Sequence, residues 1–156
     1  MTEGSKNHIQ SCRSLVSAAK VATLSTLTNE GFPYGSLVAF ASDERGRPLL
    51  LLSRLAEHTE NLKGHSEASL LVCEAASEGA DPLALGRVTI IGSCTLVPDA
   101  EKADVRTTFL ARQPSAATYV DFADFAFYRL EPRALRYVGG FGRMSWVDAK
   151  EYLASP

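Results

Sequence analysis

The sequence predicts a small α+β protein, mainly β, in which antiparallel strands form a barrel accompanied by a few short helices. Three observations favour this class. The chain has 156 residues, which suits one domain with a core of its own. About seven segments have strand patterns, and most follow one another with only a short turn between them. A doubly wound parallel sheet would need a helix after each strand, and the pattern does not contain those helices.

The composition is that of one folded domain, which we expect to span residues 1–156 with a flexible polar segment at 1–8. Hydrophobic residues make up 46% of the chain and charged residues 22%, which excludes general disorder. The formal net charge is -2, so no nucleic-acid partner is expected. The longest apolar run, residues 48–52, is too short to cross a membrane, so no membrane partner is expected either.

Cysteine usage and the N-terminus indicate the compartment. Cys12, Cys73 and Cys94 are widely spaced and form no pattern of zinc ligands. The first ten residues are polar and carry no signal-peptide core. We therefore expect a cytoplasmic protein with reduced thiols and without a metal site.

The first half of the chain reads as a helix followed by three strands. Residues 9–20 place apolar or small side chains at every third or fourth position, which indicates one face of a helix. A run rich in β-branched residues follows and ends at the turn sequence Asn29-Glu30-Gly31. The third strand, residues 48–53, is apolar almost throughout, as is typical of a strand buried on both faces.

The second half mixes short helices with longer strands. Gly64 is expected to end a short helix at 57–63, and residues 74–86 are the best candidate for a mobile loop. Asp99 is expected to cap a helix that reaches about Gln113, and a tail helix is expected at 147–153. The expected strands are residues 21–28, 32–42, 48–53, 68–73, 87–97, 125–130 and 135–138.

One segment predicts an anion site. The apolar strand ends at Ser53 and Arg54, and a helix is expected to begin three or four residues later. Free amides at a helix start, beside a hydroxyl and a guanidinium, favour a phosphate. His58 and Thr59 would add donors from the first turn. The alternative is structural, with Ser53 and Thr59 as capping groups and Arg54 as a solvated strand end.

Two further segments permit a flat ligand. Small residues around Ser36 would let such a ligand approach the strand backbone, although a tightly packed barrel strand has the same pattern. The glycine-rich segment at 139–142 is followed by Trp146, and Phe141 and Trp146 would flank a planar ring. A strand-end turn with two core aromatics explains it equally well. No residue is assigned as catalytic, because no nucleophile motif is present, and nothing makes an acid/base pair of Asp121 and Asp124.

Taken together, these segments resemble the FMN-binding split barrels related to pyridoxamine 5'-phosphate oxidase. The resemblance begins with Val-Ala-Thr-Leu-Ser-Thr-Leu from residue 21, Leu-Leu-Leu-Ser-Arg from residue 50 and His-Thr-x-Asn-Leu from residue 58. Tyr-Arg-Leu-Glu-Pro from residue 128 and Val-Gly-Gly-Phe-Gly from residue 138 resemble the haem-utilisation (HugZ-type) branch of that superfamily. The resemblance therefore covers almost the whole chain.

The resemblance implies a homodimer with FMN at the subunit interface and, as activity, an FMN-dependent oxidoreductase acting on an unidentified small planar substrate. It implies that the backbone around Ser36, Leu37 and Val38 lies along the isoalloxazine edge. It also implies that Gly140, Phe141 and Trp146 approach the site from the partner subunit or close its mouth. The implied phosphate ligands are Ser53, Arg54, His58, Thr59 and Asn61.

The sequence also differs from both families at several motif positions. Ser36 and His58 stand where pyridoxamine phosphate oxidases have Arg and Lys, and their C-terminal Arg-x-His motif is missing, so vitamin B6 oxidation is not expected. Haem-degrading members carry a ligand His near their end, whereas this chain has no His after His65. Two alternatives to the flavoprotein therefore stay open. One is a haem-binding or haem-degrading protein, and the other is a non-catalytic dimeric binding protein on a degenerate barrel.

Overall fold

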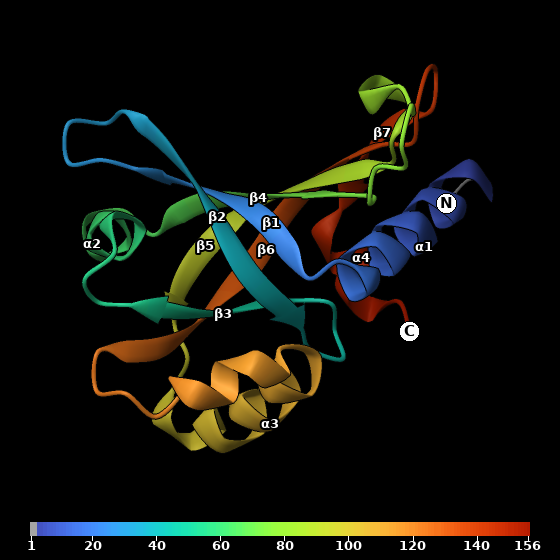
Figure 1. Ribbon diagram of the computed structural model, residues 1–156. Helices are drawn as coiled ribbons and strands as arrows, with labels where there is room; N and C mark the ends of the chain where they lie inside the picture. The colour runs from blue at the N-terminus through green and yellow to red at the C-terminus, as the bar shows by residue number, and fades with distance from the viewer. Residues whose placement is uncertain (1–2) are drawn as a thin grey trace.

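The computed structural model describes residues 3–156, with seven strands and four α-helices in that range (Figure 1). Met1 and Thr2 lie outside the described residues. Three short 3-10 turns, Pro82–Ala84, Asp99–Glu101 and Pro114–Thr118, join the main elements. The main elements are α1 (Glu3–Ala18), β1 (Val21–Leu27), β2 (Pro33–Ser42), β3 (Pro48–Ser53), α2 (Glu57–Gly64), β4 (Glu67–Cys73), β5 (Arg87–Leu96), α3 (Lys102–Arg112), β6 (Phe125–Val138), β7 (Met144–Asp148) and α4 (Ala149–Ala154).

Six of these strands close into an antiparallel barrel. Their order is β3-β2-β1-β4-β5-β6, and pairing between β3 and β6 completes the ring. The seventh strand, β7, pairs with the second half of β6 and extends the sheet beyond the barrel. The antiparallel barrel predicted from consecutive short strands is therefore confirmed, because hairpin connections pair neighbours in sequence.

The C-terminal strands differ from the prediction. The two strands expected at 125–130 and 135–138 are one long strand, β6, which runs through Glu131-Pro132-Arg133. A register shift between Ile91 and Gly92 of β5 lets the ladder pass Pro132, which has no amide hydrogen to donate. Gly92 is required at this bulge, because a Cβ there would overlap the Glu131 carbonyl.

Strand β7 was not predicted, and the expected tail helix begins at Ala149 instead of residue 147. Asp148 caps this helix, because its Oδ1 accepts hydrogen bonds from the amides of Lys150 and Glu151 at 2.8 and 3.1 Å. Trp146 consequently lies on a strand and not in a glycine-rich loop. Five residues are too few for a periodic signal, so the strand exists only through its pairing with β6.

Two helix predictions also need correction. Helix α1 begins at Glu3, well before the expected start at residue 9, and part of the segment expected to be flexible is therefore helical. Asp99 does not cap α3 with its side chain. It opens a 3-10 turn and forms an ion pair with Lys102 at 2.5 Å. Polar residues at the start of α1 gave no apolar stripe to detect.

Two apolar clusters hold the barrel together. The larger fills the barrel interior, and Val16 of α1 and Tyr152 of α4 cover one of its ends. The smaller lies outside the barrel, where Phe109 of α3 packs on Leu49 and Phe127. Strand β3 borders both clusters, which confirms that its continuous apolar sequence marks burial on both faces.

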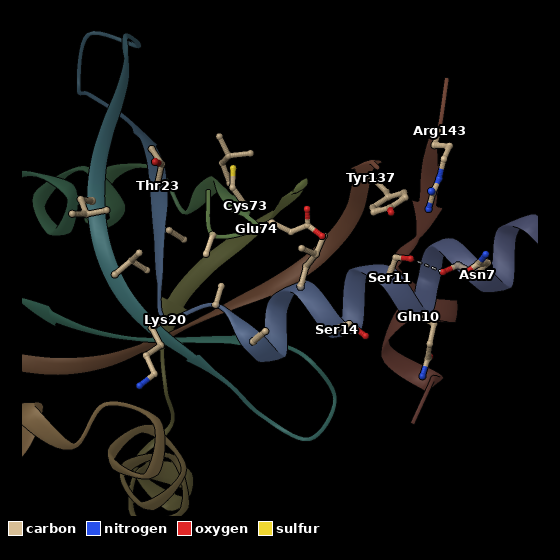
Figure 2. A pocket seen from close by; sticks show the side chains of 18 residues that line it. Asn7, Gln10, Ser11, Ser14, Lys20, Thr23, Cys73, Glu74, Tyr137 and Arg143 are labelled. Atoms are coloured by element: carbon tan, nitrogen blue, oxygen red, sulfur yellow. Dashed lines mark hydrogen bonds between the residues drawn. The ribbon is translucent and has the colours of Figure 1, made fainter. Parts of the chain in front are cut away.

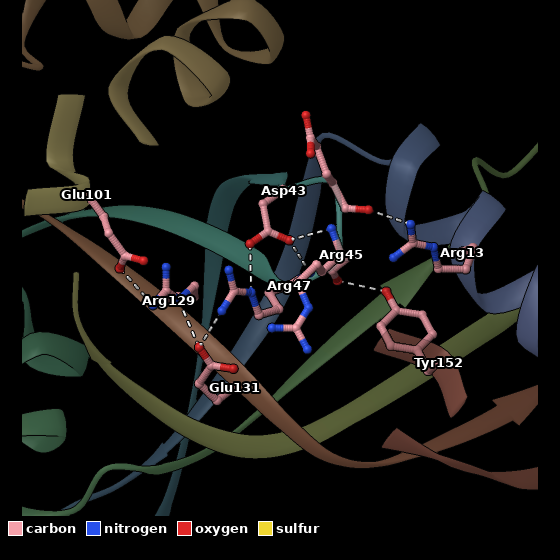
Figure 3. Close-up of polar contacts among 10 residues, drawn as sticks. Arg13, Asp43, Arg45, Arg47, Glu101, Arg129, Glu131 and Tyr152 are labelled. Carbon is pink, nitrogen blue, oxygen red and sulfur yellow. Dashed lines mark hydrogen bonds and ion pairs between the residues drawn. The ribbon is translucent and has the colours of Figure 1, made fainter. Parts of the chain in front are cut away.

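A partly buried ion-pair network links the turn between β2 and β3 to the strand opposite (Figure 3). Arg129 of β6 binds Glu101 at 3.0 Å and Glu131 at 2.8 Å. Arg47 binds Glu131 at 3.0 Å and Asp43 at 2.7 Å. Shared carboxylates and limited exposure make such pairs stronger than isolated surface pairs. Within residues 3–156, no helix is long and apolar enough to cross a membrane.

Candidate functional site

The predicted anion site lies at the turn between β3 and α2, and two of its expected ligands face inward. Asn61 is buried and donates its side-chain amide to Thr26 Oγ1 on β1 at 3.0 Å. Thr59 is fully buried, and its hydroxyl has no partner in the described part of the chain. Neither side chain faces solvent, and the Asn61 bond anchors α2 to the barrel wall.

Ser53 is already engaged by a carboxylate. Its Oγ donates to Asp124 Oδ2 at 3.1 Å and accepts from the amide of Leu55 at 3.2 Å. The Arg54 amide donates to the Asp124 carbonyl at 2.7 Å, while the Arg54 side chain is exposed. Asp124 therefore holds the turn through both its side chain and its backbone. Asp121, which the sequence placed near it, pairs instead with Arg106 at 2.8 Å.

His58 and Ser36 do come together. His58 Nδ1 and Ser36 Oγ are 3.0 Å apart, and Ser36 Oγ lies 3.5 Å from the Leu24 carbonyl oxygen. Burial lowers the pKa of His58 below its ordinary 6.5, so the ring is neutral at pH 7. Leu37 points outward and is 77% exposed, whereas the Val38 side chain is buried in the barrel core. A ligand can therefore meet Val38 only through its backbone.

The other predicted site residues lie elsewhere. Gly140 is buried with φ near 100°, Phe141 is exposed, and Trp146 on β7 is 62% exposed beside the Arg136 guanidinium. Figure 1 shows β7 and α2 on opposite sides of the barrel. Within one subunit the aromatic residues therefore do not meet the β3–α2 turn.

The outward face of the sheet connects these two regions. The strand register aligns one residue from each of six strands in a row that runs from Leu37 on β2 to Trp146 on β7. Five interstrand spacings separate Leu37 from Trp146, so the two residues lie roughly 24 Å apart along the sheet. We call this surface the outward face. Only Arg136 is charged in that row, which consists of Leu37, Thr23, Leu71, Thr89, Arg136 and Trp146. Val21, Ile91 and Met144 are exposed apolar side chains on the same side of these strands.

An open groove of about 1010 Å³ borders the outward face (Figure 2). It runs between α1 and the strands β1 and β4, and Leu37 and Leu71 belong both to its lining and to the outward face. Figure 2 shows Tyr137 and Arg143 facing α1 across the groove, with the Lys20 amine turned away from them. No predicted phosphate ligand lines the groove. Sequence reasoning missed it because segments distant along the chain form it.

The side chains around this region define the chemistry that it can support. Among residues 3–156, no group of three His, Cys, Asp or Glu side chains is placed to hold a metal ion. Burial raises the pKa of Cys12 and Cys94 to about 12, so neither is a reactive thiolate. The usable groups are the exposed guanidiniums, the Ser36–His58 pair and the apolar outward face.

Comparison with known proteins agrees with this architecture. The family model described as "CREG, beta-barrel" matches residues 3–154. A relative from Arabidopsis thaliana, named a non-canonical heme oxygenase (HOZ, chloroplastic), is 40% identical over 134 residues, which cover 85% of this chain and 40% of the relative. The solved structure of a heme binding protein from Mycobacterium smegmatis superposes with a TM-score of 0.88 at 35% identity, covering 94% of this chain and 60% of that one.

The chain thus spans less than two thirds of both relatives. Two further solved structures share the fold. One is Campylobacter jejuni ChuZ, with a TM-score of 0.76 at 20% identity, covering 92% of this chain and 58% of that one. The other is a pyridoxinephosphate oxidase family protein from Clostridium acetobutylicum, with a TM-score of 0.71 at 14% identity, covering 94% of this chain and 98% of that one. The split barrel, with both haem-binding and pyridoxine phosphate oxidase-like neighbours, agrees with the resemblance drawn from the sequence.

Proposed function

Because this chain belongs to the CREG β-barrel family, whose model spans nearly all of it, we propose that it binds haem between two copies of itself. The observation that carries the proposal is the outward face, whose row from Leu37 to Trp146 holds one charged side chain, together with the groove along its border. Exposed apolar surface of this extent marks an interaction site. The names of relatives that are 35% and 40% identical support haem as the ligand.

A second copy of the chain is the partner that the face suits. Leu37 and Trp146 lie at opposite ends of one row, so a two-fold axis through the middle of the row brings each end over the opposite end of the other copy. Leu37 of one copy then meets Trp146 of the partner subunit. This arrangement unites the two halves of the predicted site, which one subunit keeps apart.

The residues present suit a porphyrin. Leu37 and Leu71 offer apolar contact to a flat ring, and the exposed Arg54 of one copy and Arg143 of the partner subunit would meet its two propionates. The proteins' side chains would hold the ring and exclude water from it. Bound haem would supply the iron chemistry, whose course the surrounding polarity and donors decide.

FMN is the second candidate, favoured by the exposed Arg54 and by the Ser36–His58 pair beside the β2 backbone. It would make the protein a flavin-dependent oxidoreductase. The phosphate end fits less well than the sequence suggested. Ser53, Thr59 and Asn61 are engaged or buried, which leaves Arg54 and His58 as the available donors.

Absorbance titrations of the purified protein with haemin and with FMN test the proposal. We expect a saturable shift of the haem Soret band at one haem per subunit or per interface, and a dimer by light scattering. Loss of haem on dilution to monomer would support an interface site. A monomer that leaves the haemin spectrum unchanged would overturn the proposal. If FMN alone binds, the second candidate takes its place, and if neither binds, the barrel is a scaffold.

The compartment remains a prediction. The sequence favours the cytoplasm, whereas the plant relative is named chloroplastic. A fluorescent fusion in the source cell would decide between these compartments.

A further inference from the structure

We propose that Asp124 is a specificity-determining residue that closes the β3–α2 turn to phosphate and so selects against phosphorylated cofactors such as FMN. The inference rests on the proposed function only in treating this turn as one edge of a cofactor site. It concerns which cofactor is rejected, so it stands or falls independently of whether haem binds.

The turn has the parts of an anion site, but a carboxylate occupies its centre. The end of β3 supplies the Ser53 hydroxyl and the exposed Arg54 guanidinium, and α2 begins at Glu57. A serine hydroxyl has one hydrogen to donate, and Ser53 gives it to Asp124 Oδ2 at 3.1 Å. A phosphate bound here would have to take that hydrogen from the carboxylate.

The local charge adds to this competition. A phosphate monoester carries about -1.5 to -2 charges at pH 7, and like charges in contact repel. Glu57 and Glu60 lie in the first turn of α2, which leaves Arg54 as the cation of the turn, because Lys63 pairs with Glu60. Acidic side chains at a helix start repel an anion that approaches the same end of the helix.

The geometry of Asp124 indicates a built contact. Its backbone carbonyl accepts the Arg54 amide at 2.7 Å while its side chain accepts the Ser53 hydroxyl, so β6 is fastened to the turn at two points. The backbone bond fixes the position of Asp124, so its carboxylate stays beside the Ser53 hydroxyl. A haem propionate contacting Arg54 does not need the Ser53 hydroxyl, so Asp124 does not exclude it.

The test compares FMN with riboflavin, which has the same ring but no phosphate. Flavin fluorescence quenching is measured with the wild type, with Asp124→Asn, and with Asp121→Asn as the matched control. Asparagine keeps an oxygen that accepts from Ser53 and removes the charge. We expect Asp124→Asn to bind FMN about tenfold more tightly than the wild type, with riboflavin unchanged. The Asp121→Asn variant should bind both as the wild type does.

The expected tenfold gain in FMN affinity corresponds to about 1.4 kcal/mol. If the Asp124→Asn variant binds FMN within about twofold of the wild type, the proposal is overturned. A second measurement needs no variant. In the wild type, raising the salt from about 20 mM to about 300 mM screens the repulsion, so FMN should gain affinity relative to riboflavin. Wild-type protein that prefers FMN to riboflavin at low salt would equally overturn it. A haemin titration of both proteins reports separately on the proposed function.

Discussion

The side-chain amide of Asn61 donates a hydrogen bond of 3.0 Å to the hydroxyl of Thr26, and both groups are buried between α2 and β1. This bond joins a helix of eight residues to the barrel wall. A helix this short has little stability of its own, so its orientation depends on such contacts. The orientation of α2 in turn places His58 against Ser36.

We expect Asn61→Ala to lower the free energy of unfolding by about 1–3 kcal/mol, because it leaves the Thr26 hydroxyl buried without a partner. Urea denaturation followed by circular dichroism measures the change. Asn7→Ala on the exposed side of α1 is the control and should stay within about 0.5 kcal/mol of the wild type. Equal effects of the two substitutions would contradict a structural role for the bond.

Both the backbone conformation and the space around position 46 require a glycine in the turn between β2 and β3. Its φ is 81°, and an added Cβ would overlap the Arg13 guanidinium and the Tyr152 hydroxyl, which donates to the Gly46 carbonyl at 2.7 Å. Gly31 has a similar φ of 85° with open space around it. We expect Gly31→Ala to cost about 1–2 kcal/mol, and Gly46→Ala to cost about 1–3 kcal/mol more. Thermal unfolding of both variants separates backbone strain from overlap, and similar costs would rule out the overlap.

Stability should depend on pH through His58. Burial lowers its pKa in the folded protein, whereas the unfolded chain takes up a proton near the ordinary pKa of 6.5. Between these two pKa values the unfolded state holds more protons, so the free energy of unfolding falls as the pH falls through that window. The wild type should therefore lose more stability than His58→Gln between about pH 7.5 and about pH 5.5.

Urea denaturation at the two pH values measures this difference, and an NMR titration of the folded protein reports on the imidazole directly. A His58 pKa at or above 6.5 in the folded state would contradict the expectation.

The proposed dimer predicts that a charge on the outward face separates the subunits. Leu37→Arg should yield a monomer and weaken haemin binding with it, because an interface core does not tolerate an unpaired charge. Leu96→Arg, at an exposed position near the end of β5, is the matched control and should remain a dimer. Light scattering after gel filtration gives the masses. If Leu37→Arg stays dimeric, the interface lies on another surface.

The anion site illustrates the limit of reasoning along the chain. The hydroxyl, the guanidinium and the helix start are neighbours in sequence, so their meeting could be predicted from β3 and α2 alone. Asp124 joins Ser53 only because β6 pairs with β3, Ser53 opposite Phe125. No local sequence pattern predicts that pairing. The contact of Asp124 with Ser53 changes the proposed chemistry of the turn from accepting an anion to rejecting one.

The local chemistry of the chain determined the class of fold, the barrel, and most strand positions, since alternation of side chains and turn residues act between near neighbours. It also determined that β3 is covered on both faces. Only the tertiary structure decided that β6 is one strand, that β7 exists, and that Leu37 and Trp146 share one row. The physical reason is that hydrogen bonds between strands join residues far apart in sequence. The sequence of one strand therefore does not show which other strand it pairs with.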